Sequence, residues 1–182
     1  QTGFNNTGDF NDFMGYNAGF DINATNTVII GSNAAGENDA GSDILNSTIL
    51  GSGAGFTIDT GADNNILIGY QAANSLTTGA NNLIIGYDIE APSNTADNQL
   101  NIGNIIFGTS IDGAGTTLSS GNIGIGTTSP SSKLDVWGDF RVGTSSTPSL
   151  FVDAAANQVV IGTTTANGTG GLYLEDSSIT LR

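Results

Sequence analysis

The side chains of this sequence that can do chemistry are almost all carboxylates, because the chain contains no His and no Cys. Without those two residue types, the common nucleophilic triads and zinc sites are excluded. Two segments of the form Asp-x-Gly-x-Asp begin twenty residues apart. In a chain of stacked coils their carboxylates would lie side by side and offer oxygen ligands to Ca²⁺. Since the full calcium-loop signatures are missing, we prefer acidic turns without a metal and expect no resident cofactor. The four carboxylates are Asp39, Asp43, Asp59 and Asp63.

Three other patterns are weaker candidates for catalysis or phosphate binding. Paired carboxylates such as Asp88 and Glu90 would suit glycan hydrolysis, but only general acidity marks them, and solvated surface charge is the preferred interpretation. Ser132 and Lys133 could be considered as a Ser/Lys catalytic pair. Because adjacent strand residues face opposite ways, a lysine solvated at a turn is the preferred interpretation. The stretch GSGAGF at Gly51 lacks the glycine spacing and the following helix of a phosphate loop, so it predicts a corner. We therefore expect no catalytic, cofactor-binding or metal-binding residue and no enzyme activity.

Aromatic residues provide the remaining candidates for binding. Tyr16, Tyr70 and Tyr87 each follow a glycine at one position of a repeat. Exposed, stacked tyrosines bind sugar rings or another protein, and packing at a seam between chains would explain the same pattern. Trp137 is expected to pack in the core of a hairpin.

The charge of the chain excludes several partners. The 182 residues include 17 acidic and three basic residues, which gives a net charge of −14, and residues 1–132 contain no Lys or Arg. Such a surface repels phosphate backbones and anionic lipid headgroups, so nucleic-acid binding is not expected. No apolar run approaches the roughly 20 residues of a membrane span, and no membrane insertion is expected in this segment.

The elements that must position these residues belong to a repeat. Residues 1–103 contain six short apolar clusters, each ending in a glycine, and the glycines are spaced by 16 to 20 residues. An Asn precedes each glycine by four or five positions. Each cluster is flanked by Gly and Asn, which favour turns, and no helical periodicity is present. This pattern predicts a β-roll or β-solenoid with at most two short strands per coil. The glycines are Gly15, Gly31, Gly51, Gly69, Gly86 and Gly103, and the asparagines Asn11, Asn26, Asn46, Asn65, Asn82 and Asn98.

Stacking of the coils gives each repeated residue type a mechanical role. Asn amides would form a ladder along the stack, Gly would permit the corner, and isoleucines would stack inside as an apolar column. A narrow solenoid of short clusters leaves an apolar face uncovered, and a face of this kind usually marks an interface. The simplest cover is further copies of the chain, and unpaired terminal strands also favour end-to-end association into filaments.

The pattern changes at about residue 104. Residues 104–182 contain longer strands of alternating pattern. These strands predict about two prism-like shaft units, each built from β-hairpins and about 36 residues long. KLDVWGDFRV predicts one hairpin around Gly138, and SLFVDAAANQVVIG predicts another. No capping end is visible at residue 182, so we expect the natural polypeptide to continue. Because the chain begins with Gln1 rather than Met, we expect a mature form or an excised fragment.

The first section resembles the β-roll head of trimeric autotransporter adhesins, through the phrases NTVIIGSNAAG, NNILIGYQAA and NNLIIGYDIE. The second section resembles the β shaft of phage tail fibres and large bacterial surface fibres, through NIGIGTTSPSSKLDVWG. The resemblance implies an intertwined homotrimer located outside the cell, on a bacterial surface or a virion. In this sequence Tyr replaces the small residue that follows the glycine in three coils.

These observations together predict an acidic, all-β, extracellular fibre segment. Its expected function is structural and adhesive, with a repetitive surface that attaches to a glycan or another cell-surface ligand by many weak contacts. The alternatives are a phage tail-fibre segment that recognises host polysaccharide and, less favoured, a polysaccharide-cleaving β-helix enzyme.

Overall fold

The structure, a computed structural model, describes residues 2–36, 42–143, 148–155, 158–161 and 171–174. Within those ranges the chain is all-β, with fifteen short strands and no helix, as the repeat pattern predicts. The chain divides into two compact units, Gln1–Asp135 and Val136–Arg182. The strands are β1 (Asp12–Met14), β2 (Ile22–Thr25), β3 (Val28–Ile30), β4 (Ser42–Leu45), β5 (Thr48–Leu50), β6 (Ile66–Ile68), β7 (Leu83–Ile85), β8 (Leu100–Ile102), β9 (Ile106–Gly108), β10 (Ile123–Ile125), β11 (Leu134–Val136), β12 (Phe140–Gly143), β13 (Pro148–Asp153), β14 (Gln158–Ile161) and β15 (Gly171–Leu174).

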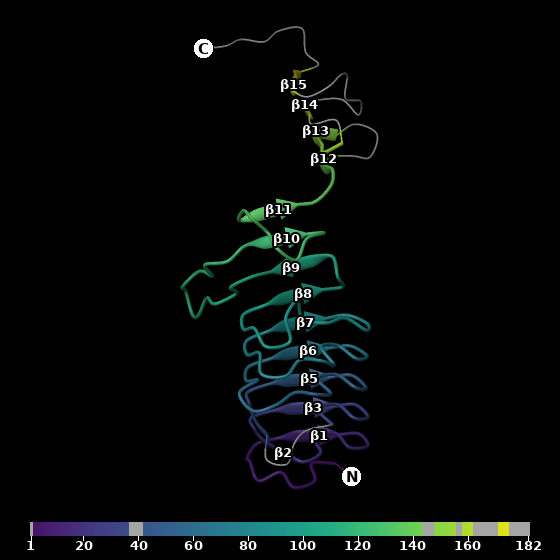
Figure 1. Cartoon of the computed structure of the whole chain (residues 1–182), viewed down its shortest axis with the longest axis vertical. Coiled ribbons are helices and arrows are strands. Elements are labelled where there is room, and N and C mark those ends of the chain that lie inside the picture. The colour runs from purple at the N-terminus through teal and green to yellow at the C-terminus, as the bar shows by residue number, and fades with distance from the viewer. Residues whose placement is uncertain (1, 37–41, 144–147, 156–157, 162–170, 175–182) are drawn as a thin grey trace. The chain divides into compact units, whose positions relative to one another are not determined.

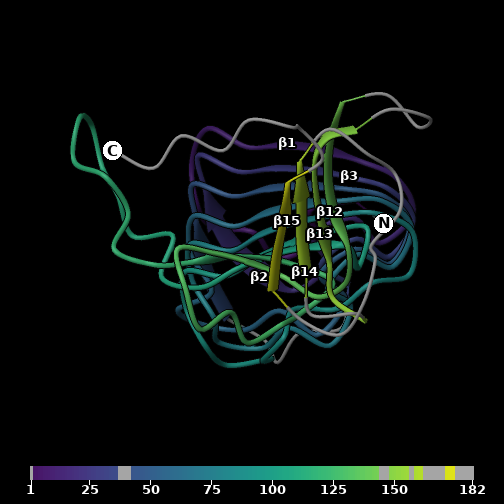
Figure 2. The ribbon, with the colours of Figure 1, turned by 90° about the horizontal axis from the view of Figure 1, so that it is seen from above.

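The first unit is a β-solenoid of about five turns (Figure 1). Strands β1, β3, β5, β6, β7 and β8 pair in parallel, one strand from each successive coil. The coils lie over one another when the unit is viewed along the stack (Figure 2). A second, two-stranded parallel sheet, formed by β2 and β4, contributes another wall of the solenoid. The predicted stacking of coils in register is therefore confirmed.

The three-residue strands place one side chain inside the solenoid and two outside, because side chains alternate along a strand. The central residues pair in one continuous register from coil to coil, and four of them are completely buried aliphatic residues. They form the apolar column that the sequence predicts, together with buried residues of the turns and the second wall. The four are Ile29, Ile49, Leu67 and Ile84.

A ladder of polar side chains, buried except for the half-buried first member Asn11, runs beside this column, one position before each strand of the parallel stack. In all but the last member, Gln99, the side-chain oxygen accepts a hydrogen bond from the backbone N–H of the same position one coil further along. The Asn65 N–H donates to Ser47 Oγ at 3.1 Å, and the Asn82 N–H donates to Asn65 Oδ1 at 2.8 Å. The Gln99 N–H then donates to Asn82 Oδ1 at 2.8 Å. Because buried backbone groups need partners, this inner column ties the coils together. Its members are Asn11, Thr27, Ser47, Asn65, Asn82 and Gln99.

A second, outer column lies one residue earlier in each coil and has a different role. All six of its residues have φ between 52° and 60°, the left-handed region that Asn tolerates better than most residues. The Asn26 amide donates to Asn46 Oδ1 and the Asn46 amide to Asn64 Oδ1, both at 3.2 Å. The outer column is Phe10, Asn26, Asn46, Asn64, Asn81 and Asn98.

The single asparagine ladder expected from the sequence is wrong, because its six asparagines belong to two different columns. Asn11, Asn65 and Asn82 belong to the inner column, whereas Asn26, Asn46 and Asn98 belong to the outer one. The spacing of four or five residues before the glycine reflects these two positions.

The repeated glycines form the predicted corner for two physical reasons. Gly15, Gly31, Gly51 and Gly69 have φ between 131° and 142°, where a side chain is strained. A Cβ at Gly69 would also lie 2.0 Å from the carbonyl oxygen of Gly86 in the next coil. The corner therefore requires glycine both for its dihedral angle and for the close approach of neighbouring backbones.

Parallel stacking ends at β8. Strands β8, β9 and β10 pair antiparallel, and β11 follows β10 in the same nine-stranded sheet. Asn101 takes the inward position of β8, where it is almost completely buried. Its amide donates to the Glu90 carbonyl and to Asn104 Oδ1, both at 2.7 Å, so the polar residue that interrupts the apolar column is satisfied.

The second unit contains the four-stranded sheet β12-β13-β14-β15. The predicted hairpin in SLFVDAAANQVVIG is confirmed, because β13 and β14 pair antiparallel. The predicted hairpin around Gly138 is wrong, since β11 pairs in the nine-stranded sheet and β12 pairs with β13. Trp137, expected in a hairpin core, is 75% exposed. The second copy of the 36-residue unit falls largely on residues outside the described ranges.

Candidate functional site

The two acidic motifs do not stack in matching register. Ser42 Oγ donates to Asp59 Oδ1 at 2.8 Å, and the Asp43 N–H donates to Thr60 Oγ1 at 3.2 Å. These contacts link positions seventeen residues apart, whereas the motifs repeat every twenty residues. Asp63 instead lies beside β4, where its Oδ1 accepts from the Leu45 N–H at 2.8 Å.

These carboxylates act as hydrogen-bond acceptors of the turns. The backbone N–H of Thr60 and then the hydroxyl of Ser42 stabilise the ionised form and lower the pKa of Asp59 below its ordinary value. Asp39 lies outside the described residues. In the part of the chain that the structure describes, no three Asp or Glu side chains gather as metal ligands.

The other candidate residues for chemistry also occupy structural positions. Glu90 accepts hydrogen bonds from the backbone N–H and the hydroxyl of Ser75, both at 3.2 Å, while Asp88 is exposed at a turn position with φ of 51°. Lys133 Nζ donates to the carbonyls of Ser120 and Gly121. Its neighbour Ser132 is exposed.

The tyrosines that follow the corner glycines are all exposed. Tyr16, Tyr70 and Tyr87 have exposed fractions of 68%, 46% and 75%. The rings of Tyr70 and Tyr87, one coil apart, stack with centroids 5.3 Å apart and planes inclined by 20°. One face of the Tyr70 ring is thus covered by Tyr87, whereas the preceding coil offers only Ser52 at the same position.

A half-open pocket of about 260 Å³ lies beside Tyr70, among three successive coils. This pocket was not among the sites expected from the sequence. Its hollow arises at the second position after the corner glycine, where Gly53 has no side chain and its neighbours along the stack are Asn33 and Gln71. The sequence does contain a pattern that indicates the pocket when the coils are aligned on their corner glycines. Gly53 falls between Asn33 and Gln71, and two aromatic residues, Phe56 and Tyr70, lie nearby. The lining residues are Asn33, Ser52, Gly53, Phe56, Tyr70, Gln71 and Asn74.

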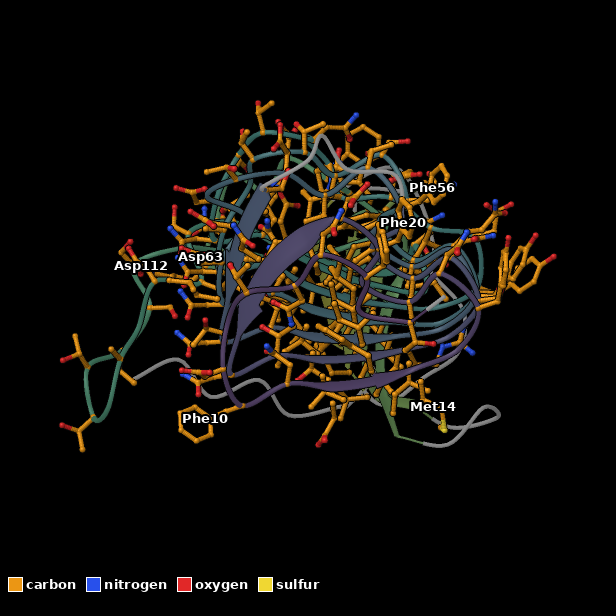
Figure 3. All side chains as sticks on the ribbon, turned by 90° about the horizontal axis from the view of Figure 1, so that it is seen from below. Phe10, Met14, Phe20, Phe56, Asp63 and Asp112 are labelled. Atoms are coloured by element: carbon orange, nitrogen blue, oxygen red, sulfur yellow. The ribbon has the colours of Figure 1, made fainter. Side chains whose placement is uncertain are left out.

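The outward face of the parallel strands, here called the outer sheet face, is a second candidate surface. In β1, β3, β5, β6, β7 and β8 the first and third residues of each strand point out of the solenoid, and all of them except the buried Leu100 are exposed or half-buried. Ten of these twelve positions are apolar, and Asp12 and Thr48 are the exceptions. Met14 is 62% exposed, Ile66 42% and Ile102 37%. Phe56, which lines the pocket, and Met14, on the outer sheet face, lie on different sides of the solenoid (Figure 3).

Comparison with protein-family models, with curated proteins and with solved structures finds no match to this chain. The class of protein is therefore defined by the fold: an all-β repeat protein whose first unit is a parallel β-solenoid compatible with a β-roll. Among the described residues there is no helix with the length and hydropathy of a membrane span.

Proposed function

We propose that this chain is a structural and adhesive segment of an extracellular homotrimeric fibre. The observation that carries the proposal is the outer sheet face. A chain with 17 acidic residues places only one of them, Asp12, on the outward positions of six stacked strands. Ten apolar side chains, all of them at least partly exposed except Leu100, therefore follow one another along the solenoid, and contiguous apolar surface of this kind marks an interface.

The cover for the outer sheet face is other copies of the same chain. A surface that repeats at one coil spacing, about 4.8 Å, is complementary to another surface with the same spacing. Closed symmetric assembly is the norm for homo-oligomers, and three copies around one axis would give each solenoid a partner for its apolar columns. The trimer itself rests on the resemblance to adhesin heads, and the apolar face supports association more generally.

Two features support the adhesive role: the regular repeat of the coils and the excess of negative charge. Coils joined by backbone hydrogen bonds in the strands and the corners hold exposed turns at regular intervals. Repetition of weak contacts along a fibre converts low affinity into avidity. An acidic surface and the extracellular location implied by the resemblance agree with attachment to a neutral ligand.

The mass of the particle in solution tests the assembly. Light scattering is expected to give three times the 18.4 kDa of one chain. Added salt should strengthen association, because three copies with a charge of −14 each repel one another and salt screens that repulsion. A well-behaved single chain under all salt conditions would contradict the proposal.

A matched pair of variants locates the interface. Ile68→Glu places a charge in the middle of the outer sheet face, with the side chain directed out of the solenoid, so the coil should fold and the trimer should dissociate. Asn94→Glu places the same charge on an exposed turn and should leave the mass unchanged. If both variants remain trimeric with native circular dichroism, the outer sheet face is not the interface.

A further inference from the structure

We infer that the pocket lined by Phe56 and Tyr70 is a binding site for a neutral saccharide. The inference names a ligand for the adhesive role proposed above and depends on that proposal for its biological meaning, but the site is built within one chain. Its lining comes from three successive coils of a single solenoid.

The aromatic residues give the pocket its apolar walls. Tyr70 stacks on Tyr87 with one face, so its ring is held in place while the face toward Ser52 has no aromatic cover. Phe56 contributes a second ring on the same pocket, and it is partly buried. A pyranose ring presents one face of C–H groups, which packs on an aromatic ring with a large apolar area.

The polar residues provide the hydrogen bonds that such a ring needs at its edge. Asn33 and Gln71 line the pocket, and within the described residues their side-chain amides make no hydrogen bond. An amide both donates and accepts, so it matches a hydroxyl, which does the same. Asn74 lines the pocket as well, and its Oδ1 already accepts from the Ser75 hydroxyl at 2.9 Å. A few placed polar groups around an apolar platform are typical of small-molecule sites.

The charge of the region selects neutral sugars over acidic ones. No lining residue carries a charge, and residues 1–132 contain no Lys or Arg to pair with a carboxylate or sulfate. The surrounding acidic residues repel anionic ligands. Uronic and sialic acids are therefore disfavoured relative to neutral hexoses and N-acetylhexosamines.

The size of the pocket indicates a short segment of a glycan. Its volume of about 260 Å³ lies just below the roughly 300–1,000 Å³ of pockets that enclose a drug-sized ligand. Three coils span about 10 Å along the stack, two spacings of about 4.8 Å each. A half-open pocket of this size suits one or two sugar rings, and several such pockets in one fibre would strengthen weak single contacts.

The site is tested by saturation-transfer difference NMR with the whole chain. The probes are neutral disaccharides of glucose, galactose, mannose and N-acetylglucosamine. Glucuronic acid and N-acetylneuraminic acid serve as acidic comparisons. At least one neutral disaccharide should receive saturation, and the acidic sugars should receive little or none. No transfer to any neutral probe, or stronger transfer to the acidic sugars, would overturn the inference.

Substitutions taken from the repeat itself assign the binding to this pocket. Tyr70→Ser introduces the serine that two other coils have at this position. Gly53→Asn introduces the asparagine that the preceding coil has at this position, Asn33, whose φ of 55° is close to the 68° of Gly53. A Cβ at Gly53 meets only the Gln71 side chain, at 3.3 Å, so the hollow fills without a backbone clash. Each variant should weaken binding tenfold or more.

The matched control is Tyr16→Ser, the same substitution in the same position of a coil that does not line the pocket. It should bind as the unmodified chain does. Retained affinity in both Tyr70→Ser and Gly53→Asn, with native circular dichroism, would overturn the assignment. The dissociated Ile68→Glu chain should still bind the sugar, so loss of the trimer and loss of saccharide binding are separate results.

Discussion

Replacement of Asn65 by alanine removes one rung of the inner column, and its effect can be worked out from the hydrogen bonds. Asn65 is completely buried. Its amide donates to the carbonyls of Ala62 at 2.8 Å and Gly79 at 2.9 Å, and its Oδ1 accepts from the Asn82 N–H at 2.8 Å. Asn65→Ala therefore leaves three buried backbone groups in two coils without these partners.

The expected loss of stability is large for a single substitution. Each buried polar group that loses its partner costs about 1–3 kcal/mol, so three such groups give about 3–9 kcal/mol. Local relaxation and entry of water into the vacated volume reduce that sum. We expect Asn65→Ala to lower the free energy of unfolding by about 3–5 kcal/mol, at or above the upper end of the usual range for point mutations.

Two companion variants separate the roles of the inner and outer columns. Asn65→Ser introduces the residue that Ser47 provides in the preceding coil, where the hydroxyl accepts from the next backbone N–H at 3.1 Å. It should recover about 1 kcal/mol relative to alanine. Asn64→Gly keeps the positive φ of the outer column and removes only an exposed hydrogen bond from Asn46, so the change should stay within about 0.5 kcal/mol.

The measurement is urea unfolding followed by circular dichroism, at one fixed protein concentration because association shifts apparent stability. Midpoints should be compared together with the denaturant slopes, so that a change in cooperativity is recognised. The reasoning is refuted if Asn65→Ala costs less than about 1 kcal/mol, or if Asn64→Gly costs as much as Asn65→Ala.

Two other predictions concern the corner and the acidic turn. Gly69→Ala combines a strained dihedral angle with a Cβ only 2.0 Å from the backbone of the next coil. It should lower the free energy of unfolding in urea by about 2–6 kcal/mol. Gly61 has φ of 91° and open space around it, so Gly61→Ala should show the dihedral cost alone. Equal losses in the two variants would contradict the close approach of backbones. The pKa of Asp59 is lowered by hydrogen bonds from the Thr60 backbone and the Ser42 hydroxyl, so these bonds stabilise the fold above the ordinary value of 3.8 and lose their effect as pH falls through the lower folded pKa. Ser42→Ala should therefore cost about 1 kcal/mol at neutral pH and less in acid, and a cost that does not change with pH would show that the ionised carboxylate is not involved.

Much of the fold follows from local features of the sequence. The three-residue clusters are too short for helices, and Gly and Asn fence them at every coil, so short strands joined by tight turns are the only regular structure they support. The corner at Gly51 was predictable for the same reason, because glycine alone is free of a Cβ. The apolar face was also predictable, since an outward position must follow each inward one along a strand.

The candidate pocket and the register of the turns could not be predicted in the same way. Asn64 and Asn65 have the same side chain, but one takes a left-handed exposed turn position and the other is completely buried. The acidic motifs repeat at twenty residues while the stacked backbone brings together positions seventeen apart. Local sequence does not distinguish these alternatives, because coils of unequal length align only through their hydrogen bonds.

What the sequence determined by itself is the period, the strand positions and the excess of negative charge, since each depends on residue types and their local spacing. What only the tertiary structure decided is which residues of different coils meet. The separation of the two asparagine columns, the exposure of Trp137 and the meeting of Gly53, Phe56 and Tyr70 at one pocket all depend on how the coils stack. The physical reason is that stacking is set by backbone hydrogen bonds between coils, whose register depends on the length of every turn.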